Sequence, residues 1–118
     1  MLADNVLRSN TILYCQQWRS TVTFYRDVLK LAVNHETDWL VEFKLQGQAY
    51  LSIADARRTS IPGADGRGLT LSLQVRDLDR AHALLGQSGI RVSAIRPVWG
   101  ARAFYLYDPE GHRIELWS

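Results

Sequence analysis

The chain has 118 residues, 47% hydrophobic and 22% charged, which is the size and composition of one compact soluble domain. Its net charge of +2 comes from basic residues spread along the chain, which excludes a basic stripe for nucleic acid or an anionic membrane. The single cysteine, Cys15, excludes an internal disulfide and fits a reducing compartment. Because no apolar run reaches the roughly 20 residues of a membrane span and no signal-peptide core is seen, we expect a cytoplasmic protein.

The first half of the chain predicts one helix among four strands. Residues 10–16 combine β-branched and apolar side chains and are typical of a strand. Residues 18–29 predict an amphipathic helix whose apolar positions recur at helical spacing: Val22, Tyr25, Val28 and Leu29. Short strands are expected at residues 32–37, 39–45 and 48–54. The order of elements is βαβββ.

The second half repeats this order after a connector. Residues 55–68 are rich in Arg, Gly, Asp and Pro and lack an apolar period. Residues 69–76 then alternate as a half-buried strand, and Asp77 is placed to cap a helix that ends at Gly89. Further strands are expected at residues 91–95, 99–107 and 112–117. The repeat indicates an internal duplication, with modules at about 8–54 and 69–117 that share one curved sheet.

The chain closes with a predicted hairpin, AFYLYDPEGHRIELWS, at residues 103–118. Pro109 has its φ already fixed and Gly111 tolerates positive φ, so the DPEG segment is typical of a tight turn. Alternation then places Glu115 on one face with Trp117, across the hairpin from Tyr105. A carboxylate at this position is either a solvated edge charge or a site residue.

Four features together resemble the vicinal-oxygen-chelate superfamily, which holds glyoxalases, bleomycin-resistance proteins and extradiol dioxygenases. They are the duplicated βαβββ order, FYRDVLKL (24–31), VRDLDRAHALL (75–85) with its following GI, and YDPEGHRIEL (107–116). The resemblance covers nearly the whole chain and implies a single α+β domain over residues 1–118. It further implies that two βαβββ modules form a curved mixed sheet around a ligand cup, with helices on the convex side.

In metal-binding members of that superfamily, His or Glu on a first strand and Glu on a last strand hold one divalent ion. The first-strand positions match Asn10 and Thr70 here, and Glu115 matches the final carboxylate, while its first-half counterpart falls on Leu51 or Tyr50. Amide and hydroxyl oxygens bind such ions weakly, so no transition metal is expected, and a hard divalent ion held partly by water is the alternative. Packing or surface roles are expected for the histidines: His35, His82 and His112.

The residues on the ligand-matched face are mostly aromatic or polar. The candidate ligand-binding residues are Asn10, Tyr14, Trp39, Thr70, Gln74, Trp99, Tyr105 and Glu115. Glu115 is also the candidate catalytic residue. The four tryptophans can equally fill core, but several near a concave polar face suit a flat or apolar ligand.

Three functions remain open at this point. The first is a metal-free protein of the bleomycin-resistance type, which binds a small organic molecule without a cofactor. The second is a metal-dependent lyase, isomerase or dioxygenase of the same superfamily, and the third is a dimeric domain with a vestigial cup. The missing metal ligands favour the first. Because a partner module commonly completes the cup in this superfamily, a homodimer is also expected.

Overall fold

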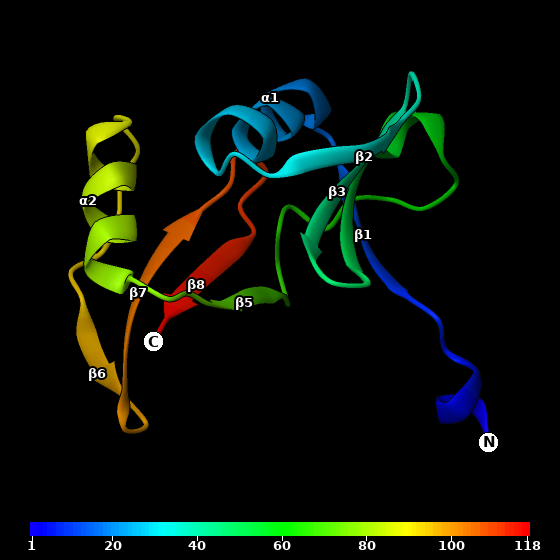
Figure 1. Cartoon of the computed structure of the whole chain (residues 1–118). Coiled ribbons are helices and arrows are strands. Elements are labelled where there is room, and N and C mark those ends of the chain that lie inside the picture. The colour runs from blue at the N-terminus through cyan, green and yellow to red at the C-terminus, as the bar shows by residue number, and fades with distance from the viewer. The chain divides into compact units, whose positions relative to one another are not determined.

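A computed structural model describes all 118 residues of the chain. It divides into two compact units, residues 1–64 and 65–118. Each unit contains one mixed four-stranded sheet and one main helix (Figure 1). The predicted α+β class and the repeated βαβββ order are therefore confirmed. None of the helices is long and apolar enough to cross a membrane.

The sheet of the first unit has the strand order β1-β4-β3-β2. Its strands are β1 (Ser9–Cys15), β2 (Ala32–Glu36), β3 (Leu40–Gln46) and β4 (Ala49–Asp55). β1 runs parallel to β4, whereas β3 pairs antiparallel with both β4 and β2. The predicted helix consists of α1 (Trp18–Thr23) followed directly by a π-helical segment, Phe24–Val28. Two short 3₁₀ helices lie outside the sheet, at Leu2–Asn5 and Ala56–Arg58.

The core of the first unit lies between this sheet and the α1 segment. The strands bury Leu13, Cys15, Val41, Phe43, Leu51 and Ile53. Val22, Phe24 and Tyr25 are buried on the helical side, and the Tyr25 ring lies 6.2 Å from that of Phe43. Leu29, which the helical pattern places in the core, is only half-buried, because the π-helical segment ends just before it.

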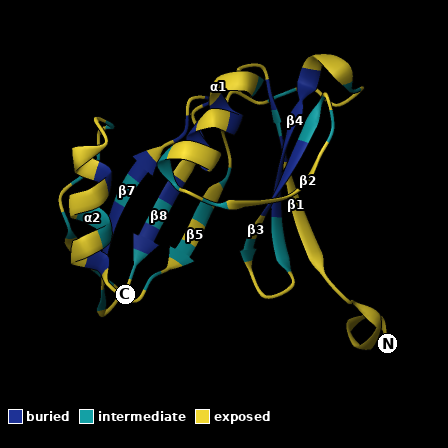
Figure 2. Ribbon diagram, turned by 45° about the horizontal axis from the view of Figure 1, so that its top comes forward, coloured by how far each residue is buried: buried dark blue, intermediate teal, exposed yellow.

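The second unit repeats this plan with the strand order β5-β8-β7-β6. Its elements are β5 (Thr70–Gln74), α2 (Leu78–Gln87), β6 (Arg96–Val98), β7 (Ala101–Tyr107) and β8 (Arg113–Trp117). The Asp77 side chain accepts the Arg80 N–H at 3.0 Å and caps α2, as predicted. Buried residues gather in β7 and β8 where they face α2, whose outer side is exposed (Figure 2). His82 packs edge-on against Phe104 there, with 4.8 Å between ring centroids.

The strand predicted at residues 91–95 is absent, and regular pairing begins only at Arg96. Ser93 explains the difference. Its backbone N–H donates to the Tyr105 carbonyl at 2.9 Å, but its hydroxyl, not a carbonyl, accepts the Tyr105 N–H at 2.8 Å. Because a side chain replaces the backbone acceptor, the ladder does not extend through this segment. The next strand also starts later than predicted, at Ala101, since Trp99 and Gly100 form the hairpin turn with φ values of 50° and 80°.

The predicted turn between β7 and β8 is organised by the buried carboxylate of Asp108. One oxygen accepts the backbone N–H groups of Glu110, Gly111 and His112 at 2.9–3.0 Å, and the other lies 2.8 Å from His112 Nδ1. The connector packs directly on this turn. A Cβ on Gly66 would lie 2.2 Å from the Gly111 carbonyl carbon, so position 66 tolerates only glycine.

We predict that Asp108→Ala lowers the free energy of unfolding by about 3 kcal/mol, because it removes the carboxylate acceptor of the buried Glu110 and His112 N–H groups and the contact with the His112 ring. Urea unfolding followed by circular dichroism measures this change. The matched control is Asp38→Ala, which removes an exposed carboxylate paired only with Arg58 and is expected to cost less than about 1 kcal/mol. Equal costs for the two variants would contradict the assigned role of Asp108.

Candidate functional site

The face of each sheet opposite its core carries polar and aromatic side chains. In the second unit these come from β5, β7 and β8, and the pairing register brings Ser72, Glu115 and Tyr105 into one row across the sheet. Thr70 and Gln74 lie on the same face of β5, since they alternate with the core-facing Leu71 and Leu73.

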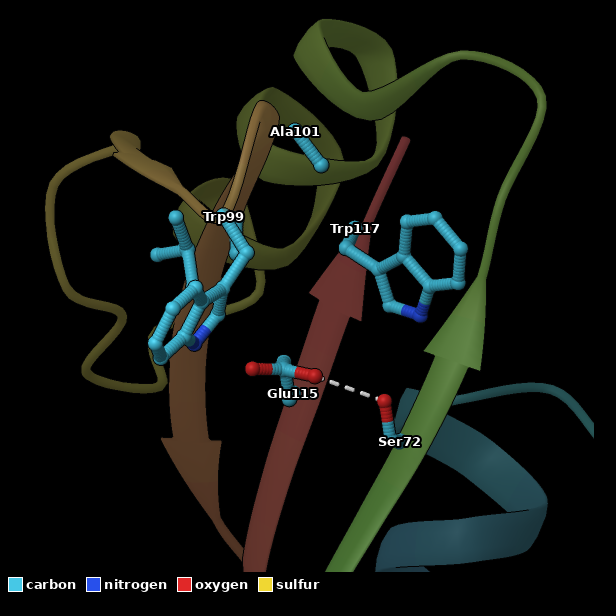
Figure 3. Close-up of a pocket in the computed structure, with 7 residues that line it drawn as sticks. Ser72, Trp99, Ala101, Glu115 and Trp117 are labelled. Carbon is cyan, nitrogen blue, oxygen red and sulfur yellow. Dashed lines mark hydrogen bonds between the residues drawn. The ribbon is translucent and has the colours of Figure 1, made fainter.

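Glu115 lies at the centre of this row and is held by two hydroxyl groups. Ser72 donates to one carboxylate oxygen at 2.6 Å (Figure 3), and the Tyr105 hydroxyl donates to the other at 2.8 Å. The hydrogen bond from Ser72, followed by that from Tyr105, lowers the pKa of Glu115 despite its partial burial. The hydrogen bond between Tyr105 and Glu115 also raises the pKa of Tyr105. Glu115 is therefore ionised near neutral pH, while both of its partners are neutral.

Arg113 is next to this row and makes its direct contacts elsewhere, but its positive charge also lowers the pKa of Glu115, less than the two hydrogen bonds do. Its guanidinium lies 4.8 Å above the Tyr105 ring, and its Nε donates to the Thr70 hydroxyl at 2.9 Å. No ion pair joins Arg113 to Glu115. The Thr70 hydroxyl is thus engaged by Arg113, and the charge of Glu115 is not neutralised by direct contact.

A cavity of about 340 Å³ opens on this face beside Glu115. It is lined by Ser72, Val98, Trp99, Ala101, Ala103, Glu115 and Trp117. The indoles of Trp99 and Trp117 lie on either side of the cavity, and the carboxylate of Glu115 lies between them (Figure 3). Trp99 is 100% exposed at the tip of the β6–β7 hairpin, so no other side chain of the chain covers it.

The structure gathers some of the sequence-predicted site residues and not others. Glu115, Tyr105 and Trp99 lie in or beside the cavity region, whereas Thr70 and Gln74 lie on the same face outside its lining. The first unit contains the remaining candidates: Asn10, Tyr14 and Trp39. Strand alternation also turns Ser72 and Trp117 to this face, although neither is among the sequence-predicted site residues. The small lining residues carry no distinctive sequence signal and are also absent from that prediction: Val98, Ala101 and Ala103.

The first unit has its own polar network, centred on Glu42 of β3. Glu42 is only 8% exposed, and its carboxylate accepts hydrogen bonds from Arg8 at 2.6 Å, Asn34 at 2.7 Å and Asn10 at 3.1 Å. Ser52 completes the network by donating to the Asn10 amide oxygen at 2.9 Å. The hydrogen bond from Asn34 is the largest cause of a lowered pKa for Glu42. Glu42 is not among the sequence-predicted site residues.

The pairing register corrects the expected first-half counterpart of Glu115. Glu115 pairs with Ser72 and Tyr105, and the equivalent row of the first sheet is Ile12, Ser52 and Glu42. The counterpart is therefore Ser52, not Leu51 or Tyr50. Leu51 is buried in the core because a shift of one residue turns a strand side chain to the opposite face.

The residues at the superfamily's metal positions do not fit a transition metal. No group of three or more His, Cys, Asp or Glu side chains lies together anywhere in the structure. The Asn10 amide oxygen already accepts from Ser52, and the Thr70 hydroxyl already accepts from Arg113. Zinc, iron and manganese bind imidazole, thiolate or carboxylate groups more strongly than these neutral oxygens.

We predict that Glu42→Gln lowers the free energy of unfolding by about 2 kcal/mol near neutral pH, because the buried network loses its negative charge and one of its two acceptor oxygens. Since the folded-state pKa of Glu42 lies below its ordinary value of 4.5, its stabilising effect is present above that pH and is lost as pH falls through the folded value. Urea unfolding at several pH values should show wild type and variant converging on acidification. Glu36→Gln, on exposed β2, is the control. A pH-independent difference would contradict this account.

Comparison with known proteins agrees with this architecture. The family model described as Glyoxalase/Bleomycin resistance protein/Dioxygenase superfamily matches residues 8–116. A lactoylglutathione lyase from Agrobacterium tumefaciens is 25% identical, with a TM-score of 0.76 over 95% of this chain and 92% of that one. No curated protein matches the sequence significantly.

Two further solved structures share the fold. A glyoxalase/bleomycin resistance protein/dioxygenase from Nocardioides is 22% identical, with a TM-score of 0.78 over 98% of this chain and 88% of that one. The antibiotic-binding protein TnmS3 from Streptomyces sp. CB03234 is 20% identical, with a TM-score of 0.77 over 94% and 93% of the two chains. The family match over residues 8–116 and the duplicated βαβββ fold show that the chain belongs to the glyoxalase/bleomycin resistance protein/dioxygenase superfamily.

Proposed function

We propose that this protein binds a small organic molecule in the cavity beside Glu115, without a transition metal or another cofactor. The observation that carries the proposal is an ionised carboxylate between two indoles at a cavity of about 340 Å³. Pockets for small ligands in proteins measure roughly 300–1,000 Å³ and combine apolar walls with a few oriented polar groups.

The composition of the cavity wall fits this role. Glu115 and Ser72 are its polar side chains, and their positions are fixed by a hydrogen bond of 2.6 Å. The other walls are apolar or aromatic, so few polar groups of the protein lose their water when a ligand enters. A ligand would also cover part of the Trp99 indole, which is otherwise fully exposed to water.

The side chains at the superfamily's metal-ligand positions favour ligand binding over metal-dependent catalysis. The alternative function, as a metal-dependent lyase, isomerase or dioxygenase, requires a metal that polarises vicinal oxygens or activates dioxygen. The side chains at the corresponding positions are Asn10, Thr70 and Ser52 with Glu115, and only the last is a strong ligand. TnmS3 is an antibiotic-binding protein, so the shared fold is compatible with a binding role.

We expect native mass spectrometry and elemental analysis of freshly purified protein to detect a bound organic mass without stoichiometric zinc, iron or manganese. Glu115→Ala should release that mass, because it removes the charged group of the cavity. Glu36→Ala, which removes an exposed carboxylate of β2, should retain it. Stoichiometric metal that is lost in Glu115→Ala, together with a measurable turnover, would replace this proposal with the enzymatic alternative.

We also propose that the protein acts as a cytoplasmic homodimer. Large apolar side chains are exposed near the N-terminus, where a partner would cover them: Met1, Leu2, Val6 and Leu7. Cys15 is the single cysteine of the chain and is buried, which suits a reducing compartment.

Light scattering at micromolar concentration should give twice the chain mass of 13.5 kDa. The double variant Val6→Ser and Leu7→Ser should shift this mass toward the monomer, because it removes exposed apolar surface. Leu84→Ser, at an exposed position of α2, is the matched control. A monomer mass for the wild-type protein would end the homodimer proposal.

A further inference from the structure

We infer that the ligand of this cavity is an organic cation, an ammonium group carried on a flat apolar body. This inference rests on the proposed function and adds the class of ligand. It derives from the sign of the charges that line the cavity and from the chemistry of the two indoles.

The charges around the cavity favour a cation. Glu115 is the only ionisable group with a formal charge among the seven lining residues. Its hydrogen-bond partners, Ser72 and Tyr105, are neutral hydroxyl groups, so they orient the carboxylate without cancelling its charge. Each carboxylate oxygen accepts one of these hydrogen bonds and keeps further acceptor capacity for a ligand N–H group.

The neighbouring arginines lie outside the cavity lining, and none forms an ion pair with Glu115, although the charge of Arg113 acts on it from a distance. Arg113 stacks on Tyr105 and donates to Thr70, while Arg102 donates two hydrogen bonds to Asp79. Arg96 pairs with Ala103 and shares its face of the sheet, but it is exposed and does not line the cavity. The attraction between Glu115 and a ligand cation in direct contact exceeds the repulsion from these solvent-screened arginines, because Coulomb energy falls with distance and with solvent exposure.

The indoles of Trp99 and Trp117 provide the second part of the recognition. The face of an indole carries negative electrostatic potential and attracts a cation, and tryptophan is the most effective aromatic residue for this contact. Two indoles that flank a carboxylate therefore attract an ammonium group and disfavour an anion. Val98, Ala101 and Ala103 leave apolar wall for the rest of the ligand.

The test uses three probes that share one aromatic ring and differ in charge: benzylammonium, benzyl alcohol and benzoate. Each is titrated into the full chain at constant ionic strength while NMR follows the indole N–H signals of Trp99 and Trp117. Trp18 and Trp39, in the first unit, serve as internal controls. We expect benzylammonium to bind at least about tenfold more tightly than benzyl alcohol, and benzoate to bind more weakly than the alcohol.

Variants assign this preference to particular groups. Glu115→Gln should reduce the ratio of benzylammonium to benzyl alcohol affinity to within about twofold, because the amide is isosteric and neutral. Trp99→Leu should weaken benzylammonium binding by about threefold or more without loss of fold, since Trp99 is fully exposed. Arg96→Gln should strengthen benzylammonium binding. Tyr107→Leu, which changes an exposed aromatic residue of β7 outside the cavity, should leave all three affinities unchanged.

The possible failures are distinguishable. Equal affinities for benzylammonium and benzyl alcohol, or tightest binding of benzoate, would overturn the ligand class while leaving the cavity as the binding site. If none of the three probes shifts the Trp99 and Trp117 signals, both this inference and the proposed function are wrong. A preference for benzylammonium that survives in Glu115→Gln would also overturn the inference, because another group would then carry the selectivity.

Discussion

The two-residue alternation of side chains along each β-strand is the constraint on which the site depends. It assigns Phe104, Leu106, Ile114 and Leu116 to the core under α2 and turns their neighbours to the opposite face. The pairing register then sets Ser72, Glu115 and Tyr105 side by side without any loop. Because packing on one face fixes the phase of each strand, the hydrogen-bonded row on the other face is fixed by the same packing.

The equivalent side-chain rows of the two modules have different environments. In the second, the carboxylate belongs to the last strand and opens on a cavity, whereas in the first the acid lies on β3 and a serine occupies the last strand. Glu42 is enclosed by donors from Arg8, Asn10 and Asn34, so its charge is compensated within the protein. Glu115 has only neutral hydrogen-bond partners. The duplication thus preserved the backbone pairing while the two acids acquired different electrostatic environments.

Much of this architecture is predictable from the sequence, because periodicity and turn chemistry are local properties. The repeated element order, the Asp77 cap and the final hairpin follow from short patterns. The failures share a physical cause, which is that they depend on contacts distant in the chain. Ser93 looks like an ordinary strand residue, and only its position beside Tyr105 shows that its hydroxyl interrupts the ladder. Glu42 likewise looks like a solvated strand carboxylate until Arg8 and Asn34 are brought to it.

Under the proposed function, the hairpin that presents Trp99 links ligand binding to the stability of the fold. Trp99 adopts a left-handed backbone conformation, with φ of 50°, which costs a non-glycine residue about 1 kcal/mol. The indole buries no apolar surface that would offset this backbone cost, since it is fully exposed. Stability alone would therefore favour glycine here, and the proposed ligand contact is what the tryptophan adds. Under the proposed function, replacing Trp99 by glycine exchanges ligand contact for backbone stability, a trade-off confined to one position of the chain.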